Sequence, residues 1–452
     1  MPACPSSPID LLAARVGATS DRVTGPDAWR EEADARASTD LVAALAAVPD
    51  PRARRGIRHR LVTVLALAVC AVLAGARSYV AIAEWAHDLP LGVRVRLGLS
   101  VHRATPSESA VRRLLQKVDP QALDRAVSDW VIARAARTSP PTPGPPTPGP
   151  PTPGPPQSSV PRDAQQPNAG SGPAHIAAPR PRVSSPRIQS PRVIAVDGKS
   201  ARGARLADER AVHLLAALDT SSGIVLGQSV VDGKTNEITA FTPLLDRIDI
   251  TDAIITADAL HTQDEHARYL HRRGAHYVFI VKGNRPRLHQ QLAGLPWPDI
   301  PVVEASQDAG HGRRESRTLK LAAVGNGVTG AILFPHAQLA VQIVRRRRPA
   351  TSRRWHSETV YAVTDLSWQQ TRADQLAEAI REHWHVENRL HWIRDVTFAE
   401  DLSQIRTGHG PANMATLRNF ALSRHRIAGA DNIAAACRHV GRHPNRVLPL
   451  LT

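Results

Sequence analysis

The chain has 452 residues, enough for two or three domains that each bury a core. Lysine and arginine number 57 against 41 aspartate and glutamate, a net charge of +16, and this excess predicts a polyanionic partner, most commonly nucleic acid. A GC-rich genome produces a similar excess of arginine, so charge alone does not identify the partner. Cys4, Cys70 and Cys437 are too far apart for a Cys-x-x-Cys metal pair and argue against a disulfide framework, which fits a reducing cytoplasm.

Neither a secretion signal nor a membrane span is expected. The N-terminus lacks a basic region followed by an apolar run. The most apolar window, residues 61–76, has 16 residues between Arg60 and Arg77, which is too short to cross a bilayer. We expect this window to be a buried helix of a cytoplasmic protein.

The N-terminal part is predicted to be helical. Residues 1–37 show no sustained period, and we expect a disordered lead-in. Residues 38–138 form an all-helical domain, whose arginines suit DNA phosphates but are equally typical of solvated helix faces. Its predicted helices begin and end near 38–48, 61–76, 79–89, 103–118 and 120–136.

Residues 139–192 are predicted to be a linker, because their repeated PTPGP favours extended polyproline II and cannot form a core. We interpret this segment as a spacer; a proline-motif docking site for another protein is the alternative.

From Val193 the pattern becomes α/β. Residues 193–198 predict a buried strand ending in Asp197, and a hairpin, a helix and a second buried strand ending in Asp258 follow. A further helix and the strand at 275–284 complete the order expected of a ribonuclease-H-like fold. We assign residues 193–430 to this domain, with a β-rich insertion at 298–366 whose short strands (317–324, 331–335, 339–344 and 359–366) alternate with basic loops, and 431–452 to a C-terminal tail.

The segment 373–401 carries the most unusual pattern. Wound as one helix, it places four polar residues at successive i, i+4 positions, namely His383, Glu387, His391 and Asp395. A second stripe is predicted to pack against a core; it contains Trp384, Asn388, Trp392 and Val396. A partly buried amphipathic helix with hydrogen-bonded histidines is the plainer interpretation.

Three carboxylates are candidates for catalysis. Asp197 and Asp258 end strands that are neighbours in the expected sheet, so their side chains would emerge at one edge, and Glu387 would complete the set. Such a set suits two Mg²⁺ ions and in-line phosphoryl displacement. Taken singly, Asp197 is also typical of an Asp-Gly turn and Asp258 of a helix N-cap. Less well placed carboxylates are Asp219, Asp232, Glu237, Asp365 and Asp395, of which Glu237 and Asp395 suit supporting roles.

The motifs VIAVDGKSARGA, KTNEITAF, ITADALHTQ, YVFIVKGNRP and HWHVENRLHWIRDVTFAED resemble the DDE transposases of the ISAs-type (H-repeat-associated) insertion-sequence family. The helical stretch resembles the accessory domain of that family, and the resemblance covers about residues 40–135 and 193–425. It implies that Asp197, Asp258 and Glu387 are the metal-binding triad, with two Mg²⁺ or Mn²⁺ ions. Where the wider superfamily carries Tyr, Arg and Lys around the glutamate, this chain has Ile380, His383 and Arg394.

Contacts to DNA are predicted from basic residues near the expected active edge. The candidates are Lys282, His383, His391, Arg394 and the run Arg345, Arg346, Arg347 and Arg348, supported by Arg353 and Arg354; Lys199 and Asn284 lie nearby. Trp384 or Trp392 could stack on a base, but core packing is the favoured role. A zinc site made of His383, His385 and His391 is disfavoured, because His383 and His385 point in opposite directions on a helix.

The sequence therefore predicts a transposase that cuts double-stranded DNA at terminal inverted repeats and joins the freed 3′-hydroxyl to target DNA, acting as a homo-oligomer in a synaptic complex. The alternatives are a metal-dependent endonuclease without strand transfer and an inactive DNA-binding derivative.

Overall fold

The computed structural model describes residues 41–55, 57–100, 102–138, 191–205, 211–231, 237–310, 312–324 and 332–451. The predicted lead-in and nearly all of the predicted linker lie outside these ranges, as does Asp232. Within them, no helix combines the length and the apolar character needed to cross a bilayer.

The N-terminal region is helical, as predicted. Its elements are α3 (Leu41–Ala46), α4 (Leu61–Leu73), α5 (Tyr79–His87), α6 (Leu91–Arg96), α7 (Glu108–Leu115) and α8 (Pro120–Thr138). Every residue of α4 is buried, which confirms the prediction for this apolar window. Helix α6 was not expected from the sequence.

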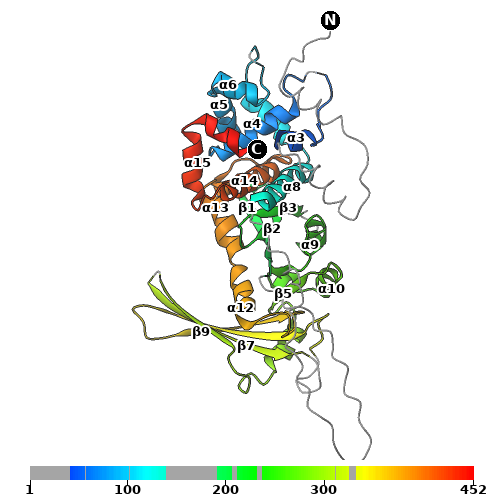
Figure 1. Cartoon of the computed structure of the whole chain (residues 1–452), viewed down its shortest axis with the longest axis vertical. Helices are drawn as coiled ribbons and strands as arrows, with labels where there is room; N and C mark the ends of the chain where they lie inside the picture. The colour runs from blue at the N-terminus through cyan, green and yellow to red at the C-terminus, as the bar shows by residue number, and fades with distance from the viewer. Residues whose placement is uncertain are drawn as a thin grey trace, which may run out of the picture.

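Buried polar contacts join this helical region to the rest of the chain. Asp124 of α8 is 2% exposed; its carboxylate accepts hydrogen bonds from the Gln228 N–H (3.0 Å) and from Arg247 (2.8 Å). The Asn413 side-chain amide donates to the carbonyls of Leu115 (2.7 Å) and Val118 (2.9 Å). The N-terminal helices thus share one hydrophobic core with the sheet and the C-terminal helices (Figure 1).

One mixed sheet runs through the remainder, in the order β3-β2-β1-β4-β5-β9-β8-β7-β6. Strands β1, β2 and β3 are antiparallel, β4 is parallel to β1, and β5 is parallel to β4. Their bounds are β1 (Val193–Arg205), β2 (Ala211–Asp219), β3 (Val225–Val231), β4 (Ile254–Ala257) and β5 (His276–Val281). The strands predicted between residues 193 and 284 are all present.

The predicted β-rich insertion continues this sheet, because β9 pairs with β5 and the other strands follow outward. Its strands are β6 (Glu304–Gly310), β7 (Arg313–Ala323), β8 (Leu339–Pro349) and β9 (His356–Thr364), and helix α11 (Pro286–Ala293) precedes them. Two expectations were wrong: Ile332–Pro335 is not part of a strand, and the arginine run at 345–348 lies within β8 and not in a loop.

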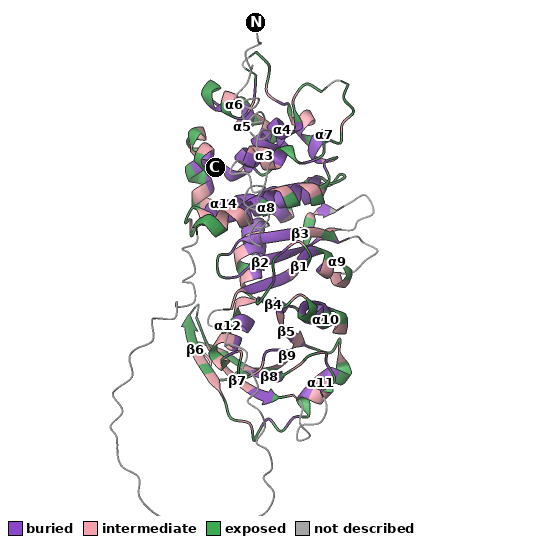
Figure 2. Ribbon diagram, turned by 45° about the vertical axis from the view of Figure 1, so that its right-hand side comes forward, coloured by how far each residue is buried: buried purple, intermediate pink, exposed green. Residues whose placement is uncertain are grey.

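Helices cover both faces of the sheet centre (Figure 2). Leu376, Ala379 and Ile380 of α12 (Ala373–Glu382) pack on one face, against alternate residues of β1, β4 and β5. Phe241 of α9 (Glu237–Leu245) and Leu270 of α10 (Asp264–Arg272) pack on the other face. The short 3-10 helix η1 (Ala259–His261) follows β4.

The segment predicted as one helix, 373–401, is divided into several pieces. Helix α12 ends at Glu382, a turn follows, and residues 387–391 form a π-helix, η2 (Glu387–His391), before α13 (Trp392–Val396). The chain ends with η3 (Glu400–Leu402), α14 (Gly410–Ile427), α15 (Ile433–Gly441) and η4 (Pro444–Leu450). The segment expected as a tail is therefore largely helical, and α15 contacts α4.

Candidate active site

Asp197 and Asp258 lie at matching positions of neighbouring parallel strands. Val196 of β1 is paired with Ala257, the last residue of β4, so the next residue of each strand is an aspartate. Asp258 leaves β4 and also caps η1, because its side chain accepts a hydrogen bond from the Leu260 N–H (2.7 Å). Asp197 does not end its strand: β1 continues to Arg205 and remains paired with β2, so the expected strand end, and the Asp-Gly turn considered as its alternative, are both wrong.

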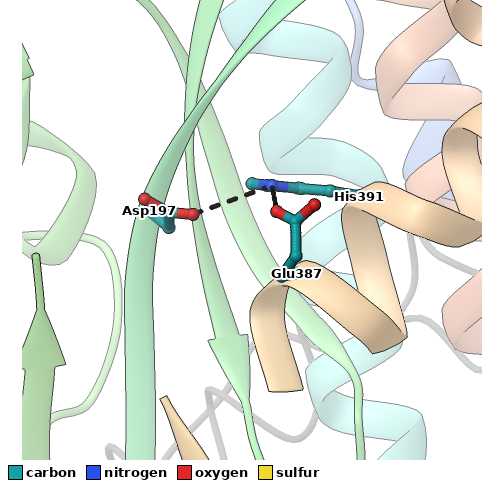
Figure 3. Close-up of side chains that lie close together, drawn as sticks. All are labelled: Asp197, Glu387 and His391. Carbon is teal, nitrogen blue, oxygen red and sulfur yellow. Dashed lines mark hydrogen bonds and ion pairs between the residues drawn. The ribbon is translucent and has the colours of Figure 1, made fainter. Parts of the chain in front are cut away.

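Glu387 reaches the same place from the first residue of η2. The Trp392 N–H donates to the Glu387 carbonyl, five residues back, which widens the helix by one residue at this point. Wide turns of this kind occur frequently at functional sites. The consequence here is that Glu387 and His391 project together toward β1 (Figure 3).

Asp197, Glu387 and His391 form a compact group. The His391 Nδ1 atom is 3.3 Å from Glu387 Oε2 and 3.7 Å from Asp197 Oδ2. One potential ligand atom from each residue lies within 4.8 Å of the others. Asp258 is outside this close group, but it lies on the neighbouring strand, directly after the residue paired with Val196, and its charge raises the pKa of Asp197.

The electrostatics of this group favour a bound cation. The pKa of Asp197 is raised to about 7, mostly by burial and also by the charges of Asp258, Glu237 and Glu387, while the hydrogen bond from the Gly198 N–H acts in the opposite direction. A divalent cation would offset the repulsion between these buried carboxylates, and carboxylate oxygens and imidazole nitrogens are suitable ligands for it. The residues present therefore fit a divalent metal.

Glu237 stands beside the site, held between two imidazoles. His213 Nε2 is 2.5 Å from one carboxylate oxygen and His261 Nε2 is 3.3 Å from the other. Hydrogen bonds from His213 and His261 lower the pKa of Glu237 to about 2. A side chain at Gly198 would collide with Glu237, so the glycine after Asp197 is explained by close approach.

Lys199 connects β1 to the segment after η2. Its Nζ atom is 2.7 Å from Asp395 and 3.7 Å from Asp401, and the side chain is largely buried. Lys199 thus holds the end of α13 against the strand that carries Asp197.

The stripe predicted to face a core is exposed instead. The exposed fractions are 59% for Trp384, 56% for Trp392 and 53% for Val396, and Asn388 is also exposed. His391 of the polar stripe is buried against the sheet, whereas the aromatic stripe faces outward. Core packing of both tryptophans was therefore a wrong expectation.

A cleft of about 1100 Å³ joins Asp258 to the arginine-rich strands. Its lining includes Lys282, His383, Trp384 and, from β8, the run 345–347. Arg345, Arg346 and Arg347 are exposed and form no ion pair with any residue that the structure describes. Arg348 is different: it donates to the Ser352 carbonyl (2.7 Å) and lies over the Trp355 ring.

Two of the predicted DNA contacts are contradicted by burial. Arg394 is 0% exposed and donates to both oxygens of Glu400 (2.8 and 2.9 Å). His391 is 3% exposed and faces carboxylates. His383 lines the cleft beside Lys282, as expected; burial lowers its pKa to about 4, so it is neutral at pH 7.

The remaining candidates occupy structural positions. Asp219 pairs with Arg192 (2.8 Å), and Asp365 pairs with His276 (3.0 Å). The three-histidine zinc alternative does not form in the described chain, where His391 is grouped with carboxylates.

A group of side chains that can hold a divalent cation, with Asp258 on the next strand at the edge of a basic cleft, is typical of α/β enzymes that act on phosphodiesters. Residues 188–424, more than half of the chain, match the family described as "Transposase DDE domain", and residues 42–131 match the family described as "DDE_Tnp_1-associated". The chain belongs to the DDE transposase family.

Individual relatives agree with this assignment. "Putative transposase YncI" of Escherichia coli O157:H7 is 26% identical over 395 residues, 84% of this chain and 85% of that protein. "H repeat-associated putative transposase YhhI" of E. coli K12 is 33% identical over 241 residues, 51% of this chain and 63% of that protein, which confirms the resemblance found in the motifs. A piggyBac transposase synaptic complex with hairpin DNA matches at a TM-score of 0.37 and 10% identity, covering 92% of this chain and 77% of that one; a score this low does not establish a common fold.

Proposed function

We propose that this protein is a DNA transposase that cuts the ends of a mobile element and transfers the freed 3′-hydroxyl to target DNA. The observation that carries the proposal is that Asp197 and Asp258 each follow the last paired residues of two adjacent parallel strands, with Glu387 supplied by a later helix, in a chain of this family. The order β3-β2-β1-β4-β5, three antiparallel strands followed by two parallel ones, supports a ribonuclease-H-like core.

Asp197, Asp258 and Glu387 would hold two divalent cations, Mg²⁺ or Mn²⁺, which supply positive charge at the attacking and leaving oxygens. In the first step the oxygen of a water bonds to phosphorus and the bond to the 3′ oxygen breaks, leaving a 3′-hydroxyl and a 5′-phosphate. In the second step that 3′ oxygen bonds to a target phosphorus, and the target 3′ oxygen leaves with a proton. Glu237 and Lys199 position the carboxylate-bearing segments without touching the DNA.

The experiment that tests the proposal is a strand-transfer assay with the full chain, Mg²⁺ or Mn²⁺ and pre-cleaved element ends. Joined products support a transposase. Cleavage without joining would indicate the alternative, a metal-dependent endonuclease, and DNA binding with neither reaction would indicate an inactive derivative. Since synapsis brings two ends together, we propose a homo-oligomer during reaction. Because the named relatives come from bacteria, we place the reaction in the bacterial cytoplasm.

We propose that duplex DNA lies in the cleft, with Arg345, Arg346 and Arg347 against its phosphates. Replacing all three with threonine, which suits an exposed strand, is expected to weaken binding at low salt. It should also reduce the slope of log K against log salt by about 0.9 for each phosphate that is no longer neutralised, or roughly 2 to 3 in total. Arg372→Ser is the control, because Arg372 is exposed and already paired with Asp374. An unchanged slope in the triple variant would contradict this placement of DNA.

We propose that Trp384 stacks on an unpaired base near the cut site, since it is exposed and lines the cleft that also contains Asp258. Trp384→Ala is expected to lower affinity for an end carrying an unpaired base by about 1–3 kcal/mol, roughly 5- to 150-fold. Trp392→Ala is the matched control, because Trp392 is equally exposed but does not line the cleft. Equal losses in the two variants, measured by fluorescence anisotropy of labelled DNA, would argue against the assignment.

A further inference from the structure

His391 is a buried group of the site that the carboxylate triad leaves without a role. It lies in η2, is 3% exposed, and directs Nδ1 at both Glu387 and Asp197. Figure 3 shows the imidazole edge between the two carboxylates, which come from β1 and from the π-helix.

We propose that Asp197, Glu387 and His391 form one divalent-cation site in which His391 Nδ1 is a direct ligand. The inference rests on the proposed function, because it assigns the ligands of one of its two ions. Ligands about 2.0–2.2 Å from a common ion lie roughly 3.0–3.7 Å apart. The separations of 3.3 and 3.7 Å from Nδ1 to the two carboxylate oxygens fall in that range.

A hydrogen bond alone explains the arrangement less well. One imidazole nitrogen carries at most one hydrogen, which cannot serve two carboxylates fully. Both distances exceed the 2.7–2.9 Å or so of a charge-assisted N–H···O bond. A cation between the three groups would contact all of them at once.

A nitrogen ligand has a chemical consequence. Imidazole suits transition metals, whereas Mg²⁺ and Ca²⁺ prefer oxygen. His391→Gln is therefore expected to weaken Mn²⁺ binding about tenfold or more, and Mg²⁺ binding by a smaller factor. His385→Gln is the matched control, because His385 lies six residues earlier in the same segment and is not part of the cluster.

The test is pulsed electron paramagnetic resonance of Mn²⁺ bound to the full chain, which detects ¹⁴N nuclei coordinated to the ion. The wild-type protein and His385→Gln should show modulation from one imidazole nitrogen, and His391→Gln should lose it. Absence of this modulation in the wild-type spectrum is decisive without any variant, so misfolding of a variant does not protect the proposal from being overturned. Bound Mn²⁺ that supports DNA cleavage but shows no ¹⁴N coupling would overturn the His391 assignment alone. Failure of Mn²⁺ to bind would overturn the proposed function with it.

Discussion

Asparagine in place of Asp258 is expected to slow cleavage of element-end DNA by about 1000-fold or more. The substitution removes one negative charge and leaves the size of the side chain unchanged. Loss of several kcal/mol of transition-state stabilisation, at 1.36 kcal/mol for each factor of ten, gives roughly this effect. The measurement is the single-turnover cleavage rate with saturating Mg²⁺.

The fold should survive this substitution, because an asparagine oxygen can still accept the hydrogen bond from Leu260 that caps η1. Asp374→Asn is the matched control: Asp374 lies on α12, is exposed and bonds only to the nearby Arg372 and its own helix turn. Wild-type rates in Asp258→Asn, or an equal loss in both variants, would show that Asp258 does not act in catalysis.

Asp197→Asn is expected to change the cleavage rate and the stability of the metal-free protein in opposite directions. The folded pKa of Asp197 is about 7 and its ordinary value is 3.8, so the folded chain binds this proton more tightly than the unfolded chain does. Without metal, the contribution of Asp197 to stability is present below pH 3.8 and is lost as the pH rises to about 7. At pH 8, Asp197→Asn should therefore lose cleavage while its metal-free melting temperature rises above that of the wild type.

Sequence reasoning located the two aspartates because buried apolar strands are visible in a sequence and the ends of parallel neighbours meet at one edge. It placed Asp258 correctly after β4. The end of β1 was predicted wrongly at Asp197. Beyond Val196, β1 pairs only with β2, and the sequence has no local signal that the strand continues to Arg205. The final strands were recognised as β-rich, but their addition to the main sheet depends on the pairing of β9 with β5, a contact between distant segments.

The segment that carries Glu387 shows more clearly what sequence patterns cannot predict. The apolar character of Trp384 and Trp392 favours a core position, but both side chains are exposed, and the segment also contains a turn at 383–384 and a π-helix that the sequence did not indicate. Residues 383–391 contain no proline or glycine that would have predicted the turn or the π-helix. Arg394 was likewise predicted to contact phosphate, because its buried hydrogen bond to Glu400 is not evident from the sequence.

The largest expected loss of stability follows from that last pair. Glu400 is 2% exposed and accepts hydrogen bonds from Arg394 and, at 2.8 Å, from Arg418 of α14. Arg394 also donates to Gln228 of β3 (3.1 Å), and Arg418 donates to the Arg77 carbonyl (3.4 Å). The buried group therefore ties the helix after the active site to the sheet and to the N-terminal helices.

Glu400→Gln is expected to destabilise the protein by about 3–5 kcal/mol, because two buried guanidinium groups would lose their shared counter-charge. Urea denaturation at pH 7 measures this loss, and Glu378→Gln, on the exposed side of α12, is the control. If the ion group were dispensable, both variants would unfold at the same urea concentration.

The pH dependence of this difference identifies its cause. Burial alone would raise the pKa of Glu400, but the charges of Arg394 and Arg418 outweigh burial and hold it at about 2, below the ordinary 4.5. The unfolded chain thus takes up this proton first as the pH falls. The stabilisation is fully present above pH 4.5 and is lost progressively toward pH 2. The gap in stability between wild type and Glu400→Gln should therefore be constant from pH 7 to about 5 and narrow below 4.5. A gap that stays constant down to pH 3 would mean that Glu400 stabilises the fold by packing and not by its charge.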